Sequence, residues 1–388
     1  MPNKNIENAI PVAPLKILAL SNCRELGERA NKLIVERRQK SLRKISNELL
    51  TLGYGQDNYL VDYSLVRNST GEGKAIINQS IRGTDLFILA DTVNYGESYK
   101  IHGSDTRMSP DDHFQDLKRV IMACSGQPRR ITVIMPFLYE GRQNIRVINE
   151  SLDCALALQE LVNMGVNSII TFDAHDSRVQ NAIPIHEFDN FHTSYQFIRG
   201  LAENATNLKL DSNHLMIISP DEGGMYRAVY YANLLGVDMG MFFKRRDYSK
   251  KLPDGTSPIA SIEFLGNDLT GKDVLVVDDM IATGDTILGV AGELKKRNAA
   301  RVFLSATFGL FTEGLERFDK YHKKGYFDLL FTTNLNYCPT DLVKRPYYRN
   351  IDLSTYISLI IDTVNHDTSV HDILDATSRI QELVQKMS

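Results

Sequence analysis

Apolar runs alternate with amphipathic segments along most of the chain. Short runs, several rich in β-branched residues, predict buried strands at 17–20, 86–89, 131–135, 168–172, 215–218, 239–243, 274–277 and 302–304. Apolar residues at helical spacing predict helices such as 26–34 and 152–164 between them. Strands that alternate with helices predict parallel sheets in an α/β fold. In such sheets ligands bind beyond the carboxyl ends of the strands.

The most informative of these strand ends follows residues 274–277. Two carboxylates, Asp278 and Asp279, come directly after the run, and a turn with Thr283, Gly284 and Thr286 then begins a helix. A helix N-terminus behind a small-residue turn binds phosphate readily, and adjacent carboxylates can accept hydrogen bonds from two vicinal sugar hydroxyls. The segment therefore predicts a site for both halves of a ribose 5-phosphate. An ordinary strand–turn–helix with a capping Asp is the alternative.

Three other strand ends carry candidate chemistry. Arg142 and Gln143 follow the strand at 131–135 and can clamp a triphosphate and a base edge, although a solvated surface loop has the same composition. His175 lies among carboxylates after the strand at 168–172 and can hold Mg²⁺ or be structural. Asp221 precedes a glycine pair that lets a ligand approach the backbone, and a simple turn explains this pattern equally well.

Length, charge and cysteine usage narrow the class of protein. The 388 residues favour two domains. The net charge of -4, from 44 basic and 48 acidic residues, gives no electrostatic footprint for nucleic acid or membrane, so local basic groups must meet any phosphate ligand. The four cysteines form no C-x-x-C pair, and no apolar run approaches the length of a membrane span. We therefore expect a soluble, cytoplasmic protein.

Taken in order, these motifs resemble one family, the ribose-phosphate pyrophosphokinases or phosphoribosyl pyrophosphate synthetases. Arg142-Gln143 is similar to the family's ATP-binding pair, and 173–175 to its Asp-x-His. The run 219–224 resembles its Ser-Pro-Asp-x-Gly-Gly, and 244–246 its Lys-x-Arg. The loop 278–286 comes last, and the match runs from roughly residue 14 to 374. Each motif occurs in other proteins, but the order and spacing are specific.

The resemblance implies a fold and a reaction. It implies two phosphoribosyltransferase-like α/β domains related by pseudo-twofold symmetry, at 14–190 on the ATP side and 191–358 on the ribose-5-phosphate side, followed by a helical tail at 359–388. Such proteins assemble into dimers and larger rings, so we expect a homo-oligomer. ATP and ribose-5-phosphate give phosphoribosyl pyrophosphate and AMP when the anomeric hydroxyl attacks the β-phosphorus of ATP.

The resemblance also assigns roles to residues. Glu72, Arg142 and Gln143 bind ATP, and His175 and Asp221 are ligands of Mg²⁺. Lys244 and Arg246 lie on a mobile loop and neutralise charge on the transferred group, with a solvated basic patch as the alternative. The run 252–258 is loop-like and favours a lid. The ribose-5-phosphate residues are Asp278, Asp279, Thr283, Gly284, Asp285 and Thr286.

Several positions depart from the family pattern. The adenine-binding segment aligns with 68–72, where Glu72 is kept but Asn68 replaces the aromatic stacking residue. Residues 35–60 and 96–110 are insertions, either of which can reshape the oligomer or allosteric surface. Two other functions remain open. A phosphoribosyltransferase explains the 278–286 loop but not Arg142-Gln143, and a non-catalytic regulatory homologue fits the altered 68–72 segment.

Overall fold

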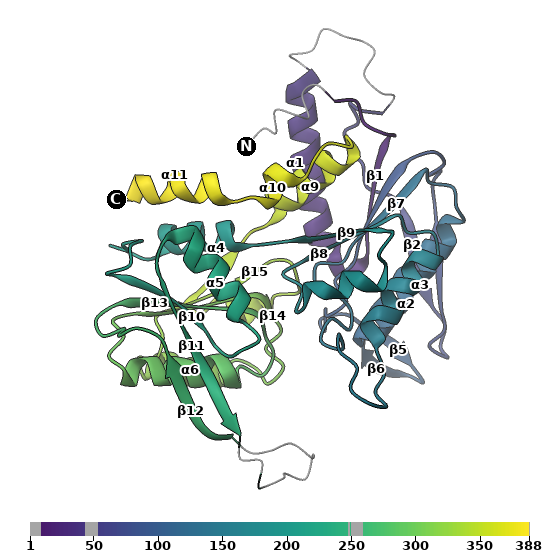
Figure 1. The fold of residues 1–388 in the computed structure, drawn as a ribbon. Coiled ribbons are helices and arrows are strands. Elements are labelled where there is room, and N and C mark those ends of the chain that lie inside the picture. The colour runs from purple at the N-terminus through teal and green to yellow at the C-terminus, as the bar shows by residue number, and fades with distance from the viewer. Residues whose placement is uncertain (1–8, 43–52, 247–248, 250–258, 388) are drawn as a thin grey trace. The chain divides into compact units, whose positions relative to one another are not determined.

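The structure is a computed structural model that describes residues 9–42, 53–246, 249 and 259–387 (Figure 1). The chain divides into two compact units. Unit 1 comprises residues 1–192, 334–337 and 352–374, and unit 2 comprises 193–333, 338–351 and 375–388. Packing therefore groups the segment 352–374 with the first 192 residues. The expected family domains remain a prediction, with bounds at 14–190, 191–358 and 359–388.

Unit 1 is built on a five-stranded sheet in the order β1-β4-β7-β8-β9, and every neighbouring pair is parallel. The strands are β1 (Leu15–Ala19), β4 (Asp85–Leu89), β7 (Arg130–Ile134), β8 (Ser168–Phe172) and β9 (Glu187–Phe191). The helices are α1 (Arg24–Leu42), α2 (Pro110–Cys124), α3 (Asp153–Asn163), α9 (Ser354–Asn365) and α10 (His371–Leu374). The parallel sheet that the apolar runs predicted is confirmed.

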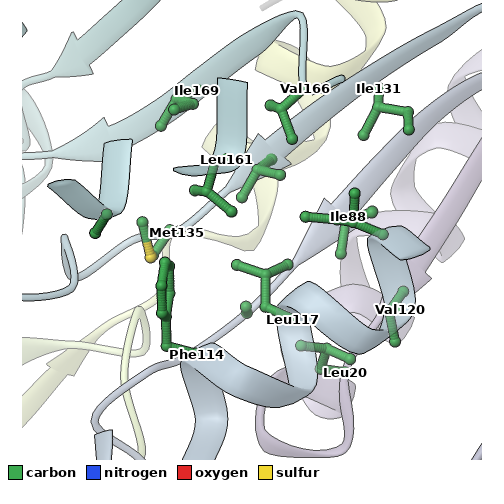
Figure 2. Close-up of a cluster of buried hydrophobic side chains, with 14 of the residues drawn as sticks. Leu20, Ile88, Phe114, Leu117, Val120, Ile131, Met135, Leu161, Val166 and Ile169 are labelled. Atoms are coloured by element: carbon green, nitrogen blue, oxygen red, sulfur yellow. The ribbon is translucent and has the colours of Figure 1, made fainter. Parts of the chain in front are cut away.

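One core of unit 1 lies between the sheet and two of its helices. Phe114, Leu117 and Val120 of α2 face Ile88 of β4 and Met135 after β7 (Figure 2). Leu161 of α3 belongs to the same buried cluster. Helix α2 begins with a capping box, in which the Ser109 side chain accepts a hydrogen bond from the backbone of Asp112 while the Asp112 carboxylate accepts one in return. Helix position is thus fixed by both packing and capping.

Two hairpins of unit 1 stand outside its main sheet. Strands β2 (Tyr63–Arg67) and β3 (Gly73–Ile77) form one, and β5 (Ser98–Ile101) and β6 (Ser104–Arg107) form the other. The second lies in the insertion at 96–110, whose regular structure the sequence did not predict. Part of the other insertion, 43–52, lies outside the described residues.

Unit 2 is built on a seven-stranded sheet in the order β12-β11-β10-β13-β14-β15-β16. All neighbouring pairs are parallel except β11 and β12, which are antiparallel. The strands are β10 (Leu215–Ser219), β11 (Asp238–Arg246), β12 (Ile259–Leu265), β13 (Asp273–Ile281), β14 (Val302–Gly309), β15 (Leu329–Thr333) and β16 (Tyr348–Ile351). The helices are α4 (Ser194–Asn204), α5 (Met225–Leu235), α6 (Asp285–Lys296), α7 (Glu316–Lys323), α8 (Thr340–Val343) and α11 (Thr377–Met387).

The C-terminal helix α11 packs against α4 and α5 of unit 2. It lies within 359–388, where a helical tail was expected. No helix in the described ranges combines the length and apolar character needed to cross a membrane.

Candidate active site

Strand β13 continues past the two carboxylates that the sequence placed at its end. Asp278 pairs with Ala306 and Ile281 with Gly309 of β14, so the parallel ladder runs on for the length of the doublet. Asp278 and Asp279 are therefore held on a strand rather than on a loop. A strand fixes side-chain direction more tightly than a loop, because the backbone of each residue is hydrogen-bonded to its neighbours.

The turn between β13 and α6 is rigidly supported. Gly284 has a φ of 86°, and a Cβ there would lie 2.5 Å from the Phe318 ring, so only glycine fits. The backbone N–H groups of Leu310 and Thr312 donate to the carbonyls of Ile281 and Ala282 at 2.8 and 3.0 Å. The turn thus has one defined shape, with α6 beginning at Asp285.

The polar side chains of this turn also bond to one another. Thr283 Oγ1 donates to Asp285 Oδ2 at 2.8 Å, and the Asp285 backbone N–H donates back to Thr283 Oγ1 at 3.3 Å. The first turn of α6 presents backbone N–H groups and a positive dipole end, which suit an oxyanion.

The carboxylate of Asp278 is costly to keep ionised, and Asp279 lies beside it. Asp279 is 5% exposed, and its Oδ1 accepts a hydrogen bond from the Met280 backbone at 2.9 Å. Asp278 Oδ1 accepts one from the Asp279 backbone at 2.9 Å. Burial, and then the neighbouring Asp279 carboxylate, raise the pKa of Asp278 well above its usual value. Arg227 of α5 opposes this shift from 3.9 Å away.

Asp221 lies at the next strand end. Its Oδ1 accepts hydrogen bonds from the backbones of Gly223 (3.1 Å) and Gly224 (3.3 Å), which shape the loop between β10 and α5. Because β10 and β13 are neighbours in the sheet, Asp221 adds its negative charge to the field at Asp278 and raises the pKa of that group further. Sequence reasoning missed Arg227, a helical residue one turn beyond the glycine pair.

In unit 1, the loop after β8 contains a strained residue. Asp173 has a φ of 40°, and its buried Oδ1 lies 3.0 Å from His192 Nδ1. A non-glycine residue in this region costs about 1–3 kcal/mol and persists only where its surroundings require it, often at functional sites. His175, two residues further on, is exposed.

A hydrogen bond ties the loop after β8 to the loop after β7. Asn144 Nδ2 donates to Asp176 Oδ2 at 2.9 Å. Hydrogen bonds from Arg178 are the main reason that the pKa of Asp176 falls to about 2, so this carboxylate is ionised at neutral pH. The exposed residues 142–143 thereby lie on a loop that is joined to the one carrying His175.

Glu72 lies elsewhere in unit 1, at the turn between β2 and β3. It is exposed, and its Oε2 accepts a hydrogen bond from Thr70 Oγ1 at 3.2 Å. The inserted β5–β6 hairpin contacts this turn: a Cβ on Gly71 would lie 2.8 Å from Ile101 Cδ1, and the Arg67 guanidinium lies 4.7 Å from the centre of the Tyr99 ring.

Lys244 and Arg246 are the last predicted site residues. Their backbones end β11, where Lys244 pairs with Ile262 and Arg246 with Ile259 of β12. Their side chains, and the predicted lid at 252–258, lie outside the described part of the structure.

The geometry thus places Asp221, Asp278, Asp279 and the 283–286 turn at the carboxyl ends of neighbouring parallel strands. Over the described residues, no three His, Cys, Asp or Glu side chains converge closely enough to hold a metal ion by themselves.

The comparisons with known proteins agree with this arrangement. Residues 15–165 match the N-terminal domain of ribose phosphate pyrophosphokinase, and residues 185–333 match the phosphoribosyl transferase domain. A ribose-phosphate pyrophosphokinase from Vibrio parahaemolyticus is 30% identical over 257 residues, which are 65% of this chain and 73% of that protein. One from Vibrio cholerae is 27% identical over 315 residues, 80% of this chain and 90% of that protein.

A solved structure has the same fold. The phosphoribosylpyrophosphate synthetase from Mycobacterium smegmatis superposes with a TM-score of 0.72 at 20% identity, over 91% of this chain and 99% of that one. The fold and the β13–α6 site define an α/β protein of the phosphoribosyltransferase type. With a matching domain in each half and a relative at 30% identity, the chain belongs to the ribose-phosphate pyrophosphokinase family.

Proposed function

We propose that this protein transfers the pyrophosphoryl group of ATP to the anomeric hydroxyl of ribose-5-phosphate, giving phosphoribosyl pyrophosphate and AMP. The anomeric oxygen forms a bond to the β-phosphorus, and the bond from that phosphorus to the oxygen bridging it to the α-phosphorus breaks. The hydroxyl proton is lost, and AMP leaves. Such a transfer depends mainly on positioning and charge neutralisation.

One observation carries the proposal. In unit 2 a single strand–turn–helix presents two rigid carboxylates, Asp278 and Asp279, immediately before a glycine-led helix N-terminus. The carboxylates accept hydrogen bonds from the ribose hydroxyls. The turn 283–286 surrounds the 5-phosphate, whose charge the first backbone N–H groups of α6 stabilise.

We assign the nucleotide to Glu72, Arg142 and Gln143. Arg142 meets triphosphate oxygens, for which a guanidinium has matching donors, and Gln143 and Glu72 bond to polar edges of the nucleotide. Lys244 and Arg246 neutralise charge on the transferred group. Each of these roles follows the family resemblance, and exposure of 142–143 at a strand end supports the first.

Following the family resemblance, we assign Mg²⁺-binding roles to His175 in unit 1 and to Asp221 in unit 2, each argued within its own unit. The donor chemistry of unit 2 fits a divalent cation, because Asp221, Asp278 and Asp279 concentrate negative charge that raises the pKa of Asp278. When bound, the ion supplies charge neutralisation and orientation of phosphate oxygens. A site with few protein ligands suits Mg²⁺, which usually keeps water and phosphate oxygens in its coordination shell. Following the family, we also propose that the active protein is a homo-oligomer.

The carboxylate assignment is tested by Asp279→Asn. A hydrogen bond to a charged group contributes about 1.5–3 kcal/mol, so affinity for ribose-5-phosphate is expected to fall about tenfold to a hundredfold. Calorimetric titration of the sugar phosphate checks this, with the exposed loop variant Asp268→Asn as a control. Equal affinities for wild type and Asp279→Asn would refute the assignment.

The activity itself is tested by AMP release from ATP, with and without ribose-5-phosphate. Release that depends on the sugar supports the synthetase. Binding of the sugar without AMP release would instead favour a regulatory homologue, the second candidate, for which the altered 68–72 turn and the hairpin packed on it are the motivating observations.

A further inference from the structure

The phosphate turn of unit 2 contains a negative charge of its own. Asp285 is the first residue of α6, and its side chain is 63% exposed. A carboxylate at this position benefits from the helix dipole, as a bound phosphate does. Residue 285 belongs to the proposed phosphate-binding turn through its backbone, but its carboxylate competes electrostatically with the phosphate.

Arg317 of α7 compensates this charge. Its Nη2 donates to Asp285 Oδ1, and its Nη1 donates to Glu313 Oε2 at 3.2 Å. One guanidinium thus neutralises part of the charge of two carboxylates beside the turn. The pairing with Asp285, and then the one with Glu313, raise the pKa of Arg317, so the side chain stays cationic.

The position of Arg317 is set by buried packing. The next residue, Phe318, is fully buried, and its ring fills the space beside Gly284 where any side chain would clash. The segment before α7 is bonded to the turn through Thr312, whose N–H donates to Ala282. The helix that carries Arg317 is therefore attached to the phosphate turn at two points, which brings the guanidinium within reach of Asp285.

We propose that Arg317 is a positioning residue of the ribose-phosphate site, which cancels the charge of Asp285 and so allows the turn to accept the 5-phosphate dianion. The inference rests on the proposed function and extends it to a residue outside the strand–turn–helix. It also explains how a turn with an internal carboxylate can bind an anion: affinity depends on the balance of charge between Asp285 and Arg317.

The test is a double-mutant cycle with ribose-5-phosphate as the calorimetric probe. Arg317→Ala is expected to weaken binding roughly tenfold, a modest effect because charges that are partly exposed to solvent interact weakly. Asp285→Asn alone keeps the backbone of the turn and removes only the carboxylate charge, so it is expected to bind ribose-5-phosphate more tightly than wild type. The double variant Arg317→Ala/Asp285→Asn is expected to return to within about threefold of wild type, because the charge that needed compensation is gone.

Kinetic readouts separate this role from a structural one. Arg317→Ala is expected to raise KM for ribose-5-phosphate, with kcat at saturation and KM for ATP unchanged, and Arg317→Lys to recover most of the loss. The effect is also expected to shrink at high ionic strength. Arg199→Ala removes a comparable exposed ion pair with Glu203 on α4 and is the matched control, expected to behave as wild type.

Two results would overturn the inference alone: wild-type affinity in Arg317→Ala, or a double variant as weak as Arg317→Ala. Both presuppose a wild-type protein that binds the sugar phosphate and releases AMP. If the wild-type protein does neither, the proposed function fails, and this inference fails with it.

Discussion

The buried carboxyl group of Asp278 lowers the stability of the folded protein at neutral pH. Burial and the adjacent Asp279 raise its pKa, so the folded protein resists ionisation of a group that ionises freely when unfolded. Below the unfolded pKa of about 3.9 the group is neutral in both states and costs nothing. As pH rises above that value, ionisation of the group stabilises the unfolded state, and the free energy of unfolding falls.

Asp278→Asn is therefore expected to stabilise the protein at pH 7 and not at pH 4. The gain is about 1–3 kcal/mol, the range for a buried polar group without full compensation. Thermal unfolding of both proteins between pH 4 and 8, without substrate, measures it. A variant less stable than wild type at pH 7 would mean that the ionised carboxylate stabilises the fold through its pairing with Arg227.

His175 provides the second prediction at this scale, on metal dependence. His175→Ala is expected to lose most turnover and to raise the Mg²⁺ concentration needed for half-maximal rate about tenfold to a hundredfold, as loss of a group that supports a metal site does. Rates are measured against Mg²⁺ concentration. The matched control is His186→Ala, which removes another exposed histidine of unit 1. A wild-type rate at limiting Mg²⁺ would make His175 structural.

At the scale of elements, sequence patterns predicted what is local. Runs of apolar residues located β8, β10 and β13, and the small residues after β13 located the turn at Gly284. Other features depend on packing between distant segments. Arg227 and Arg317 are single arginines on amphipathic helices, which have no signal of their own, and each reaches the site only because its helix packs beside a strand end or turn.

The sequence patterns also failed to predict the strands at the sheet edges. Strands β9 and β16 have mixed burial and no long apolar run, so their pairing with β8 and β15 is not visible locally. The extension of β13 to Ile281 was missed because Asp278 and Asp279 interrupt its apolar pattern. In a sequence, polar residues inside a strand look like the end of the strand. Here they are the two carboxylates that are proposed to bind the ribose.

The β2–β3 turn supports a prediction on nucleotide binding. Two candidate tyrosines have other contacts: the Tyr63 hydroxyl donates to the Ala19 carbonyl at 3.0 Å, and Tyr139 stacks on Phe114 with ring centres 4.2 Å apart. Asn68→Phe is expected to lower KM for ATP without raising kcat, because stacking on the leaving nucleoside stabilises ground and transition states alike. Base stacking in nucleic-acid sites contributes about 1–3 kcal/mol, which sets the scale.

Steady-state kinetics with ATP and GTP at saturating ribose-5-phosphate check this prediction. Asn68→Ala is the control, because it removes the amide without adding a ring. Unchanged constants for both nucleotides in Asn68→Phe would mean that another residue already supplies the stack, and Tyr99 of the inserted hairpin, which lies beside this turn, is a candidate.

At the scale of the whole molecule, the path of the chain is the feature that the sequence predicted least. Residues 352–374 follow the last strand of unit 2 yet belong to unit 1, where α9 packs against α1. The contact is a buried ionic network. Arg38 and Asp362 have side chains 1% exposed, and Arg38 Nη2 donates to Asp362 Oδ1 at 2.8 Å. No local sequence pattern predicts such a contact, because its two partners are separated by 324 residues.

The network joins residues 352–374 to the rest of unit 1. Arg38 also donates to Asn365 Oδ1 at 2.6 Å, and Asn365 donates to Asp85 Oδ2 at 2.9 Å, which links α1, α9 and β4. Burial opposes ionisation of Asp362, but the guanidinium of Arg38, and then that of Arg37, lower its pKa below the usual value. Its ionic contribution is present above the unfolded pKa and is lost as pH falls.

Asp362→Ala is accordingly expected to destabilise the protein by about 3–5 kcal/mol, because it leaves Arg38 buried without its charged partner. Denaturant unfolding followed by a probe in unit 1 measures the loss, and Asp341→Ala, which removes an exposed ion pair with Lys344, is expected to change stability by less than about 0.5 kcal/mol. The difference between wild type and Asp362→Ala is expected to narrow as pH falls below about 4, where the carboxyl is protonated in the unfolded state and approaches protonation in the folded one. A loss as small as that of Asp341→Ala at pH 7 would show that residues 352–374 pack on unit 1 without being needed to hold it together.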